Sequence, residues 1–199
     1  ESEVHFESWY ISKNILIVYN FLTHFLLNFL FFVLSKSHLK AIVQQVANNT
    51  TSWIGHHQGE TKNRISGQTF ICPTEGDLDC IEVFSAHVTN DGPVDLTIHS
   101  FDAEKKTWGA PLGTSTVEFH RNDTGRWISF PLNGLHLKKG MTYAFRLKSE
   151  AGLVGVGEAA GINNHLPFND GQEWISNSDD QKGNYFTYLS LAFKVEMRA

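Results

Sequence analysis

The sequence predicts a mainly β protein, an antiparallel β-sandwich of about eight strands behind one long N-terminal transmembrane α-helix. The helix is predicted because residues 14–35 contain no Asp, Glu, Lys or Arg, and because the first 54 residues contain neither Gly nor Pro. The sandwich is predicted because apolar and polar residues alternate from about Ile65 onward, which is the period of a half-buried strand. Two physical regimes therefore share the 199 residues of the chain.

The N-terminal regime is an apolar run whose flanks suit a membrane interface. Residues 15–34 read ILIVYNFLTHFLLNFLFFVL, and an α-helix of this length spans about 30 Å, the thickness of the hydrocarbon core of a bilayer. Aromatic and basic residues flank the run, in the segment 1–13 and just after it: Trp9, Tyr10, Lys13, Lys36, His38 and Lys40. The alternatives are a long core helix or helical bundle, and a signal peptide, although no small-residue cleavage pattern follows.

Polar residues inside this run share one helical face. Asn20, His24 and Asn28 recur every four residues, and Thr23 lies beside them. Because lipid offers no hydrogen-bond partner, such residues usually face another helix. We expect a helix-packing seam against other membrane-protein subunits or a second copy of the chain. The alternative is that single Asn and Thr residues are tolerated in a marginal anchor.

Two segments connect the helix to the sandwich. Leu39, Ile42, Val43 and Val46 recur at helical spacing, so we expect the helix to continue as a stalk, giving a helical region at 14–47. Residues 48–66 are polar and predict a linker.

The β domain is expected at residues 67–197, where turn signals rich in Gly, Pro and Asn separate short alternating segments. No helical run lies between these segments, which indicates antiparallel strands. The expected strands are residues 67–72, 78–88, 94–102, 113–120, 126–132, 142–148, 152–158 and 185–197.

Several strand-and-turn motifs recur in this region. Residues 67–73 read GQTFICP and residues 76–83 read GDLDCIEV, and residues 137–145 read LKKGMTYAF. These motifs resemble those of the jelly-roll accessory domains of bacterial surface proteins, over roughly residues 67–197. The resemblance implies an antiparallel jelly-roll β-sandwich that is similar to carbohydrate-binding modules.

The two cysteines lie at the ends of one connection, Cys72 after the first expected strand and Cys80 in the second. If these strands pair or face each other, the thiols can meet, and a disulfide would indicate an oxidising compartment. The alternative is two buried free thiols that act as small apolar groups.

Composition and motifs exclude several classes of function. A formal net charge of −5 argues against a nucleic-acid partner, and two cysteines exclude a zinc ribbon. The chain has no G-x-S-x-G, H-E-x-x-H or Walker motif, so we predict no enzyme activity, no catalytic residue, no cofactor and no metal site. Glu158, Asp170 and Glu173 are the carboxylates that could flank a cleft, but their spacing does not show it.

The long connection at residues 159–184 is the expected binding loop, because long loops in compact domains are often functional. Planar polar side chains and aromatic rings suit a sugar. The candidate ligand- or partner-binding residues are Asn163, Asn164, His165, Phe168, Asp170, Glu173 and Trp174. Calcium is a further possibility through Asp170, Asp179 and Asp180. The alternative is a solvated loop whose Phe168 and Trp174 close the end of the sandwich.

These expectations combine into a non-catalytic single-pass protein of the cell (inner) membrane. Its sandwich would bind or cap a partner protein, as an accessory or structural subunit of a membrane complex, with Trp108 as an exposed aromatic on a turn. One Lys precedes the span and two follow closely, which weakly places the C-terminal part in the cytoplasm. The disulfide and the resemblance favour the opposite side and receive more weight. The competing function is a membrane-tethered carbohydrate-binding module.

Overall fold

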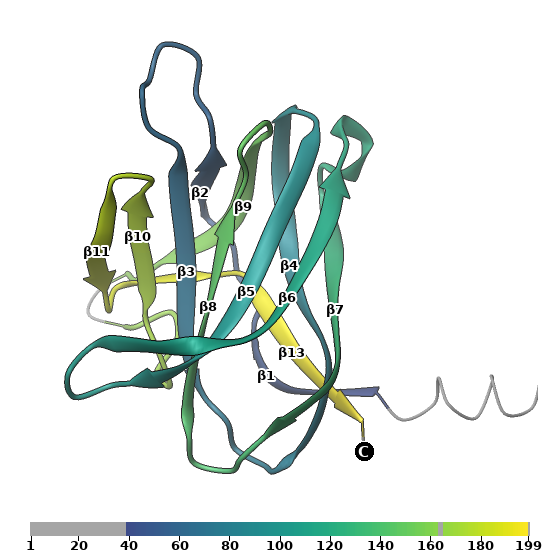
Figure 1. Ribbon diagram of the computed structural model, residues 1–199, viewed down its shortest axis with the longest axis vertical. Helices are drawn as coiled ribbons and strands as arrows, with labels where there is room; N and C mark the ends of the chain where they lie inside the picture. The colour runs from purple at the N-terminus through teal and green to yellow at the C-terminus, as the bar shows by residue number, and fades with distance from the viewer. Residues whose placement is uncertain (1–38, 163–164, 199) are drawn as a thin grey trace, which may run out of the picture. The chain divides into compact units, whose positions relative to one another are not determined.

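The computed structural model describes residues 39–162 and 165–198 (Figure 1). The chain divides after Leu39 into two compact units, and the description concerns the second. The predicted membrane span and its packing residues Asn20, Thr23, His24 and Asn28 lie outside the described residues. Within the described part of the chain, no helix has the length and apolar character to cross a membrane.

Thirteen strands and one short 3-10 helix make up the described unit. Their bounds are β1 (Leu39–Gln45), β2 (Thr50–Gly55), β3 (Arg64–Ile71), β4 (Gly76–Asn90), β5 (Gly92–Asp102), β6 (Thr107–Phe119), η1 (Arg121–Asp123), β7 (Arg126–Leu137), β8 (Thr142–Lys148), β9 (Leu153–Ala160), β10 (Glu173–Asn177), β11 (Asp180–Phe186), β12 (Leu189–Leu191) and β13 (Phe193–Arg198).

The strands form one hydrogen-bonded sheet that curls over on itself (Figure 1). Its order is β1-β13-β4-β9-β2-β3-β8-β5-β6, with β7 on β4, β12 on β9, β10 on β3 and β11 on β10. Ring contacts join strands that share no hydrogen bonds: Phe193 lies 5.6 Å from Phe145 on β8, and Phe119 lies 6.0 Å from Phe130 on β7. The first layer (β6, β5, β8, β3, β10, β11) therefore packs against the second layer (β7, β4, β13, β1), and β9 and β2 join them.

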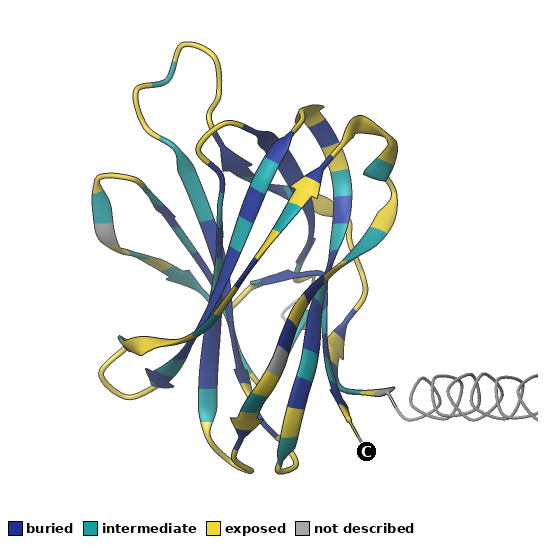
Figure 2. Ribbon diagram, turned by 45° about the vertical axis from the view of Figure 1, so that its right-hand side comes forward, coloured by how far each residue is buried: buried dark blue, intermediate teal, exposed yellow. Residues whose placement is uncertain are grey.

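A single apolar core fills the space between the layers. On β5, Leu96 and Ile98 are fully buried, whereas Asp95, the residue before Leu96, is only half-buried. Such a change between successive residues is expected because side chains alternate between the two faces of a pleated strand. Figure 2 shows the same alternation of buried and exposed residues along other strands. The predicted antiparallel β-sandwich is confirmed in this coarse form.

Each of the eight expected strands overlaps an observed one, and the differences lie in short segments. The expected helical stalk is wrong at Leu39–Gln45, which forms β1. Ile42 and Val43 pack against the core there, and so short an apolar run fits a strand as well as a helix. The expected linker contains β2. The expected strand at 185–197 is interrupted, and it divides among the end of β11, β12 and β13.

The expected disulfide between Cys72 and Cys80 is wrong, because both thiols are free and buried. The strands that carry or precede them do not pair: β3 pairs with β2, β8 and β10, whereas β4 pairs with β7, β9 and β13. Cys72 Sγ donates to the carbonyl oxygen of Thr74 at 2.9 Å, and burial raises the pKa of Cys80 to about 12. The argument from a disulfide to an oxidising compartment therefore falls.

Candidate functional site

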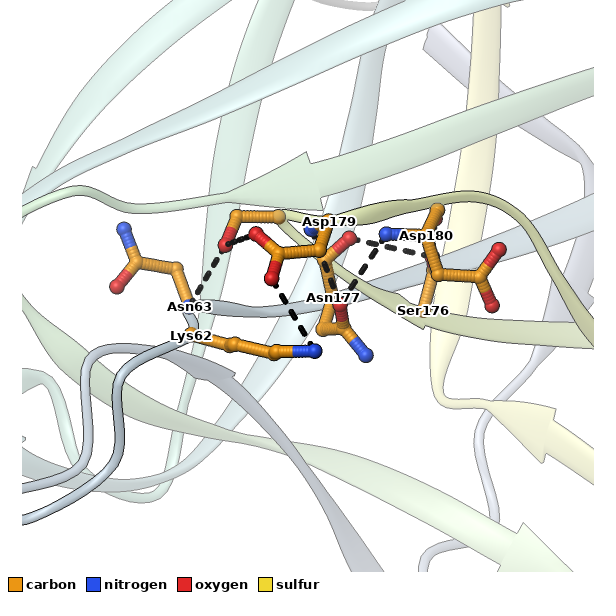
Figure 3. Close-up of polar contacts among 7 residues, drawn as sticks. Lys62, Asn63, Ser176, Asn177, Asp179 and Asp180 are labelled. Carbon is orange, nitrogen blue, oxygen red and sulfur yellow. Dashed lines mark hydrogen bonds and ion pairs between the residues drawn. The ribbon is translucent and has the colours of Figure 1, made fainter.

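The β10–β11 hairpin divides two pockets, and its turn is fixed against the β2–β3 loop (Figure 3). Lys62 Nζ lies 3.1 Å from Asp179 Oδ2, and the Ser178 amide donates to the carbonyl oxygen of Asn63 at 2.9 Å. Within the turn, Asn177 Oδ1 accepts from the amides of Asp179 at 3.0 Å and Asp180 at 3.2 Å. The hairpin therefore holds its shape and gives each pocket one wall.

The first of these, the tryptophan pocket, has a volume of about 500 Å³ and lies on the outer face of the first layer. Trp108 from β6 and Trp174 from β10 meet with ring centroids 4.9 Å apart, and His99 lies 5.3 Å from Trp108. The pocket is lined by Ile65, His99, Trp108, Gly109, Pro111, Arg146, Lys148, Glu150, Trp174, Asn177, Ser178 and Asp180.

Both indoles are held by specific contacts. Trp108 Nε1 donates to the Tyr185 hydroxyl at 2.8 Å, and Trp174 Nε1 donates to the carbonyl oxygen of Lys182 at 2.8 Å. Gly67 makes room for them, because a Cβ there would lie 3.3 Å from each indole and 2.6 Å from the carbonyl oxygen of Phe145. The two rings therefore form a fixed aromatic wall.

The polar side of the tryptophan pocket carries two bases, Arg146 and Lys148, and two acids, Glu150 and Asp180. Arg146 forms no ion pair with any described residue, whereas Lys148 Nζ lies 3.7 Å from Glu150 Oε1. His99 is buried, and burial lowers its pKa, so the ring is neutral near pH 7. Its Nδ1 lies 2.9 Å from the carbonyl oxygen of Gly109 and must carry the proton, which leaves Nε2 as an acceptor with no partner among the described residues.

The second, the glutamate pocket, has a volume of about 620 Å³ and opens between β2, the β2–β3 loop and β10. Its lining residues are Thr51, Ser52, Trp53, Gly59, Glu60, Thr61, Lys62, Arg64, Glu158, Ile175, Ser176 and Asn177. Glu158 is only 6% exposed. Beside it Glu173 is fully buried, and burial, together with the charge of Glu158, raises the pKa of Glu173 to about 9. Glu173 is therefore a neutral acid at pH 7.

The structure separates the residues expected in one binding loop. His165 and Asp170 are exposed, and Asn163 and Asn164 lie outside the described residues. Phe168 packs on Phe193 with ring centroids 5.4 Å apart. The binding role expected of these residues stays a prediction.

Much of the expected loop is in fact the β10–β11 hairpin. On β10, Glu173 is fully buried and Trp174 is 2% exposed, and their side chains alternate to opposite faces of the strand. Trp108 was expected to be exposed and is half-buried. The described residues bring together no three His, Cys, Asp or Glu side chains that could hold a metal ion.

Sequence reasoning missed Trp53, Arg64, His99 and Arg146 as pocket residues. Trp53 and Arg64 lie in the segment expected as a linker, and His99 and Arg146 are ordinary polar members of alternating strands, so no local signal marks any of them. It missed the pairing of Glu158 with Glu173 for the same reason: β9 and β10 come together only through β2 and β3.

No protein-family model matches the chain, and no curated protein is detectably similar to it in sequence. Among solved structures, the fold is similar to that of the clostridial cysteine protease Cwp84 after propeptide cleavage, with a TM-score of 0.52 and 12% identity. That match covers 82% of this chain and 41% of the other, so this chain spans less than half the length of that protein.

Two weaker similarities have TM-scores below 0.5. One is to the cysteine protease and lectin-like domains of Cwp84, a surface layer associated protein of Clostridium difficile, at 11% identity and a TM-score of 0.45, covering 69% of this chain and 33% of that one. The other is to Xyl-CBM35 in complex with a glucuronic acid containing disaccharide, at 13% identity and a TM-score of 0.32, covering 78% and 98%. The similarity to Cwp84 after propeptide cleavage, with its TM-score of 0.52, is evidence of the fold alone.

Proposed function

We propose that the described domain is a non-catalytic carbohydrate-binding module whose main site is the tryptophan pocket. The observation that carries the proposal is the fixed contact of Trp108 with Trp174 beside Arg146 in a pocket of about 500 Å³. An aromatic wall suits the CH face of a sugar ring, and convergent polar groups suit its hydroxyls. The jelly-roll accessory domains that residues 67–197 resemble are similar to carbohydrate-binding modules, in agreement with this proposal.

The carboxylates offer no support for hydrolysis. Glycosidases need two carboxyl groups that both reach the substrate from opposite sides. Glu158 and Glu173 lie together, but Glu173 is fully buried and does not line the glutamate pocket. Asp170 lies apart on an exposed segment. Binding without catalysis is therefore the simpler function.

The membrane part of the proposal rests on the sequence alone. The apolar run at residues 15–34 would tether the domain to the membrane. The resemblance to domains of bacterial surface proteins favours the side outside the cytoplasm. The face formed by Asn20, His24 and Asn28 favours a second candidate function, an accessory subunit that docks on partner helices. Replacing these three residues with Leu tests it: on a native gel, the complex should fall apart if the seam holds it together.

The test of glycan binding is a glycan array probed with the full chain in detergent, followed by affinity electrophoresis of variants. We expect Trp108→Ala and Arg146→Ala each to weaken retention by about tenfold or more, roughly 1.4 kcal/mol. Trp174→Ala is a poor test because this ring is 2% exposed and supports the fold.

The matched control is Trp127→Ala, which also removes an indole but lies on β7, where Lys194 stacks over the ring at 4.1 Å. This variant should bind glycans like the unmodified chain. An array without any bound glycan, or equal losses for Trp108→Ala and Trp127→Ala, would contradict the proposal.

A further inference from the structure

The charges that line the glutamate pocket are paired with one exception. Arg64 Nε lies 3.1 Å from Glu60 Oε2, and Lys62 Nζ lies 3.1 Å from Asp179 Oδ2 outside the pocket lining. Glu158 forms no ion pair with any described residue. Among the described lining residues, the pocket therefore holds one carboxylate without a counter-charge.

That carboxylate lies in an unfavourable place for an unpaired charge. Glu158 lies on the inward face of β9, in line with Val154 and Val156, which are both fully buried. Glu158 itself is only 6% exposed. A buried ion is costly unless it is paired and hydrogen-bonded. The buried acid Glu173 stands beside it and offers a neutral group and no positive charge.

The other lining groups suit a polar organic ligand. Ser52, Thr51 and Asn177 supply hydroxyl and amide groups, and the half-buried Trp53 supplies a ring face. A volume of about 620 Å³ lies within the range of small-molecule sites.

We propose that the glutamate pocket is a second binding site, which takes a protonated primary amine on a polyhydroxylated carrier, an amino sugar, with Glu158 as its counter-ion. The ammonium follows from the unpaired carboxylate. The choice of a sugar as the carrier rests on the proposed function. Trp53 packs against the ring of the sugar, and the hydroxyl groups of the pocket bind those of the ligand.

The experiment compares two ligands of equal length by titration calorimetry with the full chain in detergent. One is a tetramer of glucosamine, and the other is its fully N-acetylated counterpart, in which a neutral acetamide replaces each ammonium group. We expect the glucosamine tetramer to bind at least about tenfold more tightly, because a charge-assisted hydrogen bond is lost on acetylation. This comparison needs no variant, so a folding defect cannot obscure it.

Three variants then locate the site. Glu158→Gln should weaken glucosamine binding by about tenfold or more, whereas Glu173→Gln, which replaces one neutral group by another, should change it by less than about threefold. The control Glu118→Gln makes the same charge change at an exposed position of β6 and should have no effect. A merely structural role for the glutamates would not produce this asymmetry.

Several results would overturn the inference. They are equal binding of the two tetramers, unchanged binding by Glu158→Gln, or calcium alone binding to the chain and displacing the glucosamine tetramer. If Trp108→Ala loses glucosamine binding and Glu158→Gln keeps it, the ligand lies in the tryptophan pocket. That result would refute this second site and leave the proposed function standing. If glucosamine binding depends on Glu158, but Trp108→Ala weakens the binding of no glycan on the array, only the proposed main site would be refuted.

Discussion

Replacing Glu173 with Gln should make the protein more stable at neutral pH, by an amount that grows as the pH rises. Glu173 is fully buried on β10, and its carboxyl oxygens have no hydrogen-bond partner among the described residues. Burial first, and the charge of Glu158 second, raise its pKa from an ordinary 4.5 to about 9. Gln keeps the shape of the side chain and cannot ionise.

The direction follows from proton binding in the two states. Below pH 4.5 the carboxyl is protonated in both the folded and the unfolded chain, so it adds no pH dependence. Between 4.5 and about 9 the unfolded chain releases the proton and the folded chain keeps it, so the free energy of unfolding falls as the pH rises. The slope is about 1.4 kcal/mol per pH unit, which amounts to roughly 4 kcal/mol by pH 7.5.

Urea unfolding of the unmodified chain and of Glu173→Gln, at several pH values from 5 to 8, measures this difference. We expect the stability of the variant relative to the unmodified chain to rise steadily over the range, while Glu118→Gln shows a small and constant difference. A difference for Glu173→Gln that does not depend on pH would show that the folded protein does not hold this proton, and would refute the reasoning.

Three further predictions concern the fold. Phe193→Ala should cost about 3–5 kcal/mol in urea unfolding, because this fully buried ring joins the two layers, and a cost below about 1 kcal/mol would mean that the layers do not pack there. Gly55→Ala should lower the melting temperature much more than Gly125→Ala, although φ is positive at both positions, +97° and +79°. The reason is that a Cβ at Gly55 would collide with the carbonyl oxygen of Gly152, whereas no atom lies within 4 Å of a Cβ at Gly125. Equal losses would contradict this close approach. Cys80 should resist a thiol reagent at pH 8 until urea is added, because burial raises its pKa to about 12, and rapid labelling of the folded chain would show an open site.

The long strands were predictable because each carries its signal within itself. In β5, Val94, Leu96 and Ile98 alternate with polar residues, and Asn90–Pro93 marks the turn before them. The short strands β2, β10 and β11 were not, because sequences such as TTSWIG and DQKGNYF are polar and have no clear period. β2 and β10 are strands because the edges of β9 and β3 offer them unpaired backbone groups, and β11 is a strand because β10 then offers its own free edge. This is a property of the neighbours.

The candidate site was predictable only in part. The sequence singled out Trp108 and Trp174 as aromatic candidates, but their contact depends on β10 pairing with β3 next to Gly67. The sequence likewise offered Glu158 and Glu173 as separate acids. Only the packed structure shows that one lines a pocket and the other is buried behind it.

By itself, the sequence determined the antiparallel β-sandwich, because alternation and turn chemistry are local and each strand must bury its own apolar face. The tertiary structure decided which strands pair, that Cys72 and Cys80 stay apart as free thiols, and which polar groups share a pocket. These outcomes depend on contacts between segments distant in the chain. The physical reason is that burial, charge pairing and pKa are set by what surrounds a side chain, and the sequence around Glu158 does not contain its surroundings.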